Sequence, residues 1–401
     1  YTYNPASNED SYNTAVGYGA LNLDTTGKQN TAIGGEALAA NTTADNNTAL
    51  GYNALTANTT GAHNTAVGSY ALDASTTSPY NTAVGYNALS AVTTGDGRNT
   101  AVGWNAGSAL TTGAYNTAFG MQALDSTTTG AQNCAFGAYS LDTNTTANYN
   151  CAFGYYSLQL NTTGASNVAI GYYALQSNTT ASYNTAIGDQ ALEKNTTGEK
   201  NNAVGYKALE TNTTGSANTA FGHLTLNAAT TASDNTALGY QALDHNTTGG
   251  DNTAVGSAAL TANTTASNNT AVGKNALGVN STGSANTAVG NQALDHNTTA
   301  DYNSAFGAGA LTANTTGTQN TSVGYNSLEA NTTTSHHTAV GFQALGSNTS
   351  GTANTAVGSR ALDANTTGYA NVAIGHDAMG DATTGDRCIG IGAYALDAAL
   401  T

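Results

Sequence analysis

The stretch NTALGYNALTANTTGAH, residues 47–63, decides the fold because the chain repeats it with modest changes from residue 13 to its last residue. It returns as NTAVGKNALGVNSTGSA at residues 269–285. We number this unit from 1 to 17, with position 1 at the asparagine that opens it. A unit begins at Asn13 and recurs every 17 residues up to Cys388, which makes 23 units, and only the unit at 81–98 has 18 residues. Self-similarity at a short fixed period is typical of repeat architectures.

The composition and charge make several classes of partner unlikely candidates. Only 8% of the 401 residues are charged, against about 25% in an ordinary globular domain. The net charge is −16, from 24 acidic and 8 basic residues, so the chain repels phosphate groups. We therefore expect neither nucleic acid nor an anionic membrane surface as a partner. No apolar run approaches the roughly 20 residues of a membrane span, so we also expect no membrane insertion.

Several positions of the unit are nearly constant. Position 5 is glycine in every unit, from Gly17 to Gly392, which indicates a positive φ or a close approach of two backbones. Position 4 is always Val, Ile, Leu or Phe, position 9 is nearly always Leu, and positions 3 and 8 are nearly always Ala. Position 1 is Asn except at His337 and Cys388, and positions 13 and 14 are nearly always Thr-Thr.

These residues favour strands and turns over helices. A 17-residue helical hairpin would need two helices too short to be stable, and Gly, Asn and Thr are poor helix formers. We expect the segment NTAVG to form one strand, YNALTA a second short strand, and NTTG a turn. The sequence therefore predicts an all-β parallel β-solenoid (β-roll) of 23 coils with a 17-residue period, in which equivalent positions stack in columns. Residues 1–12 are expected to be a degenerate part-unit, and residues 13–401 one continuous array.

The alternation of side chains along a strand predicts which columns are buried. If the large apolar residues at positions 4 and 9 fill a core between two ribbons of strands, the alanines at positions 3 and 8 point outward. Their constant small size then indicates either packing against another subunit or crowding within the coil, and the sequence leaves both open. The asparagines at position 1 are expected to hydrogen-bond to their equivalents in neighbouring coils, because a side-chain amide both donates and accepts.

The unit NTAVGYNAL, as it stands at residues 81–89, resembles the xVAIGxxA repeats of trimeric autotransporter adhesin heads. It is also similar to the NTAxGxxAL arrays of bacterial surface proteins and phage tail-fibre-like proteins. The resemblance covers residues 13–401 and implies a left-handed β-roll, three of which pack around an axis. The units here are longer than those of adhesin heads, and the additional residues lie in the NTTG loop.

No residues in the array predict catalysis or a cofactor, so we expect a protein that is not an enzyme. The histidines have no recurring Asp or Ser partner; they are His63, His223, His245, His296, His336, His337 and His376. Acidic residues recur at position 10, and are Asp73, Asp125, Asp142, Asp244, Asp295, Asp363 and Asp397. Only Asp125 and Asp142 occupy consecutive units, so we interpret the group as solvated carboxylates and expect no metal site.

Cysteines and sequons are the remaining candidate sites. Cys134 and Cys151 both occupy position 2 of consecutive units, and stacking would place their Cα atoms about 4.8 Å apart, within the range of a disulfide. We favour reduced, stacked thiols, with Cys388 unpartnered. Position 12 heads an N-x-Ser/Thr sequon in a loop that we expect to be exposed, which makes its asparagines candidate glycosylation sites. They are Asn41, Asn58, Asn144, Asn161, Asn178, Asn195, Asn212, Asn246, Asn263, Asn280, Asn297, Asn314, Asn331, Asn348 and Asn365.

The function that these features favour is that of an extracellular, cell-surface structural fibre. Twenty-three coils of about 4.8 Å give a rod of roughly 110 Å, and because the array begins and ends inside a unit we expect a longer parent chain or head-to-tail assembly. The partners would be further copies of the chain, in a trimer or filament. The alternative is an adhesin or tail-fibre shaft that binds host glycan or matrix, with some of the 22 tyrosines as stacking platforms. The unit at 99–115, with Trp104, Gly107 and Leu110, is the irregularity that favours binding most.

Overall fold

The computed structural model describes residues 11–397, which form an all-parallel β-solenoid with a 17-residue period and no helix. This confirms the fold class predicted from the repeat. Each unit contributes one strand of three residues. The strands are β1 (Thr14–Val16), β2 (Thr31–Ile33), β3 (Thr48–Leu50), β4 (Thr65–Val67), β5 (Thr82–Val84), β6 (Thr100–Val102), β7 (Thr117–Phe119), β8 (Cys134–Phe136), β9 (Cys151–Phe153), β10 (Val168–Ile170), β11 (Thr185–Ile187), β12 (Asn202–Val204), β13 (Thr219–Phe221), β14 (Thr236–Leu238), β15 (Thr253–Val255), β16 (Thr270–Val272), β17 (Thr287–Val289), β18 (Ser304–Phe306), β19 (Thr321–Val323), β20 (Thr338–Val340), β21 (Thr355–Val357), β22 (Val372–Ile374) and β23 (Ile389–Ile391).

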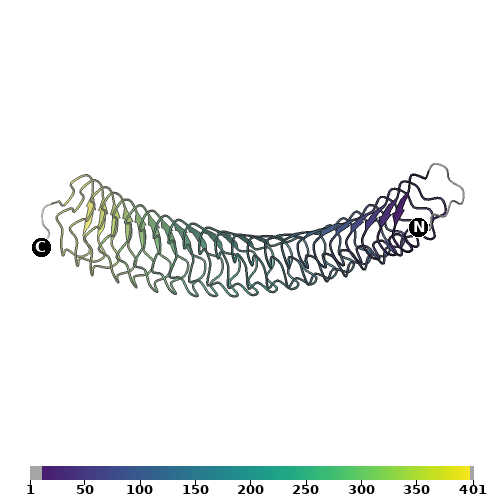
Figure 1. Cartoon of the computed structure of the whole chain (residues 1–401). Helices are drawn as coiled ribbons and strands as arrows, with labels where there is room; N and C mark the ends of the chain where they lie inside the picture. Colours follow the sequence, from purple (N-terminus) through teal and green to yellow (C-terminus); the bar gives the residue numbers. More distant parts are fainter. Residues whose placement is uncertain (1–10, 398–401) are drawn as a thin grey trace. The chain divides into compact units, whose positions relative to one another are not determined.

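The 17-residue units group into two larger compact units. The first unit is Tyr1–Lys200, with β1–β11, and the second unit is Asn201–Thr401, with β12–β23. Within each unit, consecutive strands pair in parallel without stagger, so that like positions lie side by side (Figure 1). Ala169 pairs with Ala186 in the first unit and Ala254 with Ala271 in the second. The side chains at each position therefore form a column, as the sequence predicts.

The face of the strand that points inward is the one expected to point outward. Ala49 and Ala66, at position 3, are completely buried, whereas Ile33 and Leu50, at position 4, are 38% and 45% exposed. The prediction that position 4 fills the core and position 3 points outward is therefore wrong. The interior accepts no more than a methyl group at position 3, so crowding within the coil, and not a neighbouring subunit, explains the constant alanine.

The predicted second strand is absent, because positions 6–11 form consecutive turns throughout residues 11–397. In the unit that begins at Asn47, Asn53 and Leu55 have φ of 57° and 52°, and His63 at position 17 has φ of 60°. These left-handed residues turn the chain so that Ala54 and Leu55, although adjacent, are both completely buried. The expected alternation, with Ala outward at position 8, is wrong for this reason. There is one ribbon of strands, and its inner face packs on the alanine and leucine columns.

The invariant glycine at position 5 is needed both for its positive φ and for the close approach of two backbones. Gly256 has φ of 135°, a backbone conformation that other residues rarely adopt. A Cβ atom on Gly256 would also lie 2.6 Å from the carbonyl oxygen of Gly273 in the next coil. Glycine therefore permits both the sharp corner after the strand and the close stacking of successive corners.

Buried asparagines at position 1 join each coil to the next. The backbone N–H of Asn269 donates to Oδ1 of Asn252 at 3.0 Å, and Oδ1 of Asn269 accepts from the backbone N–H of Asn286 at 2.9 Å. Nδ2 of Asn269 donates to the carbonyl oxygen of Gly283, at position 15 of the same coil, at 2.9 Å. The expected column of asparagines is confirmed, although its most regular contacts run from side chain to backbone.

A second column of buried asparagines, at position 12, closes the coil from the other side. Nδ2 of Asn280 donates to the carbonyl oxygen of Gly283 at 2.8 Å and to Oδ1 of Asn263 in the preceding coil at 3.2 Å. The carbonyl group at position 15 therefore accepts from two buried amides of its own coil. Since a buried carbonyl without a partner is costly, these two bonds hold the NTTG loop against the strand.

The 18-residue unit shows where the coil tolerates an insertion. Its extra residue lies in the loop TTGDGR, where Gly95 and Gly97 both have positive φ. The register is restored at once, because Thr82 pairs with Thr100 and Val84 with Val102. The loop absorbs the residue without a shift in the columns.

We expect Gly256→Ala to destabilise its coil by about 2–4 kcal/mol, because the new methyl group adds backbone strain and a clash with the next corner. Ala258→Gly is the matched control in the same coil, since Ala258 has φ of 57° and glycine should relieve strain there. It should be neutral or stabilising by up to about 1 kcal/mol. Hydrogen exchange at the amides of β14–β16 measures both changes; equal effects of the two substitutions would contradict the role assigned to position 5.

Asn269→Ala should cost roughly 2–3 kcal/mol, because it leaves the buried N–H of Asn286 without its acceptor and removes one donor from the carbonyl of Gly283. The control is Thr265→Ala, which changes an exposed side chain in the preceding coil and should have little effect. Urea unfolding, followed with local hydrogen exchange, measures the difference. Equal stability of the two variants would show that the asparagine column does not hold the coils together.

Candidate functional surface

The outer face of the sheet carries two parallel columns of side chains. Position 2, mostly Thr, and position 4, always Val, Ile, Leu or Phe, both point away from the interior. At position 4 the exposed fraction is 51% for Val16, 54% for Phe221 and 67% for Ile391. No charged residue occupies either position in any of the 23 strands. Exposed apolar surface of such extent typically marks an interaction site.

Aromatic side chains at position 6 border this face in many coils. Tyr52, Tyr86 and Trp104 are about half exposed. Some neighbours stack along the axis: the ring of His223 lies between those of Tyr206 and Tyr240, with centroids 5.1 and 5.5 Å apart. The aromatic border therefore extends the outer face beyond the strand.

The densest group of aromatic rings lies on β7–β10, and we call it the aromatic block. It consists of Phe119, Phe136 and Phe153 at position 4, Tyr155 and Tyr172 at position 6, and Tyr139, Tyr156 and Tyr173 at position 7. The three phenylalanines stack with centroids 5.5 and 4.8 Å apart and interplanar angles of 12° and 3°. The tyrosines at position 7 stack at 5.0 and 5.4 Å.

The tyrosines at positions 6 and 7 of the aromatic block also contact one another. The rings of Tyr155 and Tyr156 lie 4.1 Å apart, and those of Tyr172 and Tyr173 4.2 Å apart, in edge-on arrangements. A hydrogen bond with Tyr155 is the main cause that raises the pKa of Tyr156 to about 12. The aromatic block is therefore continuous across both positions. These residues lie up to 54 positions apart in the sequence, from Phe119 to Tyr173, and come together only because the coils stack in register.

The unit around Trp104 proves to be a compensated change in the core. Gly107 replaces the leucine of position 9, and Leu110 replaces the asparagine of position 12. Leu110 is 2% exposed, so its side chain enters the interior from the opposite side of the coil. Trp104 is 47% exposed at position 6. Packing accounts for Gly107 and Leu110, while binding at the exposed Trp104 stays a prediction.

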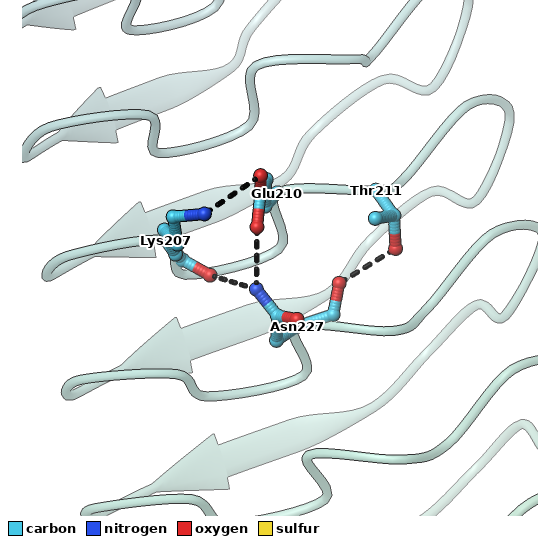
Figure 2. Close-up of polar contacts among 4 residues, drawn as sticks. All are labelled: Lys207, Glu210, Thr211 and Asn227. Atoms are coloured by element: carbon cyan, nitrogen blue, oxygen red, sulfur yellow. Dashed lines mark hydrogen bonds and ion pairs between the residues drawn. The ribbon is translucent and has the colours of Figure 1, made fainter.

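A polar edge formed by positions 7 and 10 flanks the turns. Nζ of Lys207 lies 3.2 Å from Oε1 of Glu210, and Nδ2 of Asn227 in the next coil donates to Oε2 of Glu210 at 2.9 Å (Figure 2). Nδ2 of Asn227 also donates to the carbonyl oxygen of Lys207 at 3.0 Å, and the hydroxyl of Thr211 donates to the carbonyl oxygen of Asn227 at 2.6 Å. These bonds tie adjacent coils to each other.

The position-10 aspartates lie on this edge and are less solvated than expected. Asp244 is only 8% exposed, and burial raises the pKa of Asp73, Asp244, Asp295 and Asp363. Burial, with the charge of Asp125 as a second cause, raises the pKa of Asp142 to about 6. Because the pKa of each of these carboxyl groups is higher in the folded state, their ionisation lowers the stability of the fold as the pH increases. Within residues 11–397, no group of three or more His, Cys, Asp and Glu side chains is placed to hold a metal ion.

The candidate stacked thiols lie on the outer face beside the aromatic block. The register of β8 and β9 pairs Cys134 with Cys151, and both are half-buried and free of disulfide bonds. Burial raises the pKa of both thiols, which favours their protonated form. Cys388 ends the asparagine column, where its backbone N–H donates to Oδ1 of Asn371 at 2.9 Å.

The expectation that the sequon asparagines are exposed is wrong, while their glycosylation stays a prediction. All fifteen sequon asparagines, from Asn41 to Asn365, are completely buried. They form the position-12 column, in which Nδ2, the atom that a glycan would modify, is engaged: in Asn58, for example, it donates to the carbonyl oxygen of Gly61 at 3.0 Å. The exposed residue of the loop is the threonine at position 14, such as Thr60. The folded coil therefore does not offer the sequon asparagine.

Apart from the adjacent His336 and His337, the histidines lie in separate coils. His245 and His296 contact backbone carbonyl groups through Nδ1, and His223 belongs to an aromatic stack. His376 lies 3.3 Å from Asp377, which also pairs with Arg360. The expectation that the chain is not an enzyme stays a prediction.

No protein-family model matches the chain, and no curated protein is similar to it. The resemblance to adhesin heads stays a prediction. In the described part of the chain, no helix has the length and apolar character that a membrane span requires.

His337 substitutes for asparagine at position 1 and should make one coil sensitive to acid. Its Nδ1 accepts from the backbone N–H of Asn354 at 3.3 Å, and Nε2 lies 2.9 Å from the hydroxyl of Thr334. Burial lowers the pKa of His337 to about 4, because protonation would place a charge in the interior and an N–H against the N–H of Asn354.

Since the pKa is lower in the folded state than the ordinary 6.5, the stability is complete above pH 6.5 and is lost as the pH falls towards 4. We expect the wild type to lose about 2 kcal/mol between pH 6.5 and 5 at this coil. His337→Asn should not show this loss, whereas His336→Asn, which changes the exposed neighbour, should retain it. Hydrogen exchange in β19–β21 at the two pH values measures the effect; a wild type and His337→Asn with the same pH dependence would refute it.

Proposed function

We propose that the chain is a non-enzymatic structural rod that associates side by side with further copies of itself through the outer face of its sheet. The observation that carries this proposal is the apolar column at position 4, which runs without interruption through each of the two compact units. This column is partly exposed, whereas the leucine column at position 9 is buried. Covering so many exposed apolar side chains with another surface removes them from water, which favours association.

The period of the column favours a second copy as the covering surface. Successive side chains of a column are about 4.8 Å apart along the axis. A partner that matches such a column over many coils needs the same period, and another solenoid of the same chain has it. Outside the aromatic block the columns are nearly uniform, as coil-by-coil contact with a second copy requires.

The size of the face is sufficient for a specific interface. Twelve strands of the second unit, each about 10 Å long and about 4.8 Å apart, present roughly 600 Å². Two copies would then bury about 1,200 Å² over this unit alone, which is the lower end of the range for specific complexes. The eleven strands of the first unit add a similar area.

The distribution of charge also supports this mode of association. The net charge of −16 opposes contact between copies in general. The strands themselves carry no charge, so contact through positions 2 and 4 is the approach that avoids repulsion best. Carboxylates such as Asp125 and Glu210 lie on the polar edge at position 10.

Glycan binding, the alternative function, receives less support from the aromatic residues. Sugars stack on open ring faces, but in the aromatic block the phenylalanine faces cover one another at 4.8–5.5 Å and present their edges outward. The extracellular location rests on the resemblance to surface-protein repeats. It would be tested by labelling intact cells of the source organism with an antibody against the chain.

The proposal predicts that charges on the outer face abolish self-association. Val255→Asp, Val272→Asp and Val289→Asp together place three like charges on neighbouring strands of the second unit, and should shift the protein from oligomer or filament to monomer. Sedimentation velocity and electron microscopy measure this change, and circular dichroism reports whether the solenoid remains folded.

The matched control carries the same charges on the loop of the same three coils: Thr265→Asp, Thr282→Asp and Thr299→Asp. These threonines are exposed, so the control should associate like the wild type. A wild type that is monomeric at all accessible concentrations would refute the proposed function, as would a face variant that associates like the control.

A further inference from the structure

A face made of uniform columns has no defined axial alignment. When one copy slides along another by one coil, about 4.8 Å, the threonine and aliphatic columns meet nearly the same partners as before. Pairing through uniform columns is therefore prone to slip, as it is for strands whose pattern does not specify a register. An assembly that depends on the outer face needs a local feature to fix the alignment.

The aromatic block coincides with the longest interruption of the threonine column. In β8, β9 and β10, position 2 is Cys134, Cys151 and Val168 in place of threonine. Position 4 of the same strands is Phe136, Phe153 and Ile170, so both outward columns are apolar over three consecutive strands.

Charge is scarce around the aromatic block as well. Between Arg98 and Asp189 the only charged residues are Asp125 and Asp142, both at position 10 and away from the outer face. The second unit has a shorter apolar pair at position 2, Val372 and Ile389, without phenylalanine at position 4.

We propose that the aromatic block sets the axial register between parallel copies of the chain, so that β7–β10 of one copy lie against β7–β10 of the next. This inference rests on the proposed self-association through the outer face. In register, the cysteine, valine and phenylalanine side chains of the two copies meet one another, and threonine meets threonine elsewhere in the first unit. Parallel copies satisfy both conditions over the whole of β1–β11 only when the shift is zero.

An axial shift between copies weakens their association in two ways, through lost hydrogen bonds and through poorer packing. A shift of three or more coils places mostly threonine hydroxyls of each copy against Cys134, Cys151 and Val168 of the other, where valine offers no hydrogen bond and a thiol offers only a weak one. A buried hydroxyl without a partner is costly. The same shift sets the three stacked phenylalanines against smaller aliphatic side chains, which leaves gaps at the edges of the aromatic block because packed surfaces adapt poorly to changes in volume.

The register is measured by photo-crosslinking in the full-length chain. A benzophenone amino acid replaces Val67, an outward residue of β4 that lies outside the aromatic block, and copies with and without ¹⁵N are mixed before assembly. Mass spectrometry then identifies crosslinks between copies. In the wild type we expect these crosslinks to fall within one coil of residue 67 of the partner copy.

The test variant replaces the residues of the aromatic block at positions 4 and 6, together with the three apolar residues at position 2 of the same coils, with residues that the chain uses at the same positions elsewhere. It combines Phe119→Val, Phe136→Val, Phe153→Val, Tyr155→Ser, Tyr172→Ser, Cys134→Thr, Cys151→Thr and Val168→Thr. Because other coils fold with these residues, the solenoid should be retained, and circular dichroism checks this. Association should persist, while the crosslinks spread over shifts of several whole coils.

The control variant removes aromatic residues of the second unit, which lie outside the aromatic block, through Phe221→Val, Phe306→Val, Tyr240→Ser and Tyr325→Ser. It should keep the crosslinks of the wild type. A test variant with unchanged crosslinks would overturn the inference, as would wild-type crosslinks that are spread or that run in the antiparallel sense. If the wild type gives no crosslinks between copies and sediments as a monomer, the proposed function itself fails.

Discussion

In most coils the solenoid depends on one carbonyl group, that of position 15, and on two buried asparagines, at positions 1 and 12, that donate to it. Asn269 and Asn280 reach the carbonyl of Gly283 from the two sides of the same coil, and each also bonds to a neighbouring coil. The coil is thereby closed on itself and joined to the stack by the same side chains. The interior is too narrow to hold many large apolar residues. The asparagine columns therefore stabilise it together with alanine and leucine. The folded sequons follow from this requirement, since their asparagines serve the interior.

The period, the solenoid and the in-register columns could be predicted from the sequence, because a unit repeated so often has few other ways to satisfy its backbone. The orientation of the strand could not be predicted by alternation alone. Alternation holds within NTAVG but fails after the glycine, where left-handed residues such as Asn53 and Leu55 place two consecutive side chains inside. Asparagine adopts a positive φ more readily than most residues, but a leucine gives no signal of it, since it does so only when the surrounding structure imposes it.

A signal for the correct orientation was nevertheless present in the repeat. Position 4 varies from valine to phenylalanine, a change in volume that a close-packed interior would not tolerate from coil to coil. Position 3 hardly varies at all. Tolerance of size, more than hydrophobicity, distinguishes the inner from the outer column in this chain. The aromatic block was harder to recognise, because Phe119, Phe153 and Tyr172 become one surface only when coils are stacked without stagger.

The loop of the unit at 81–98 has a consequence for how such a protein can change through evolution. Gly95 and Gly97 accommodate one additional residue, and the next strand resumes its alignment at Thr100. A single-codon insertion at this corner is therefore harmless, and gain or loss of a whole 17-codon block would add or remove one coil while every column stays intact. The gene can adjust the number of coils by recombination between its own near-identical segments, and natural selection can act on length without first rebuilding a core.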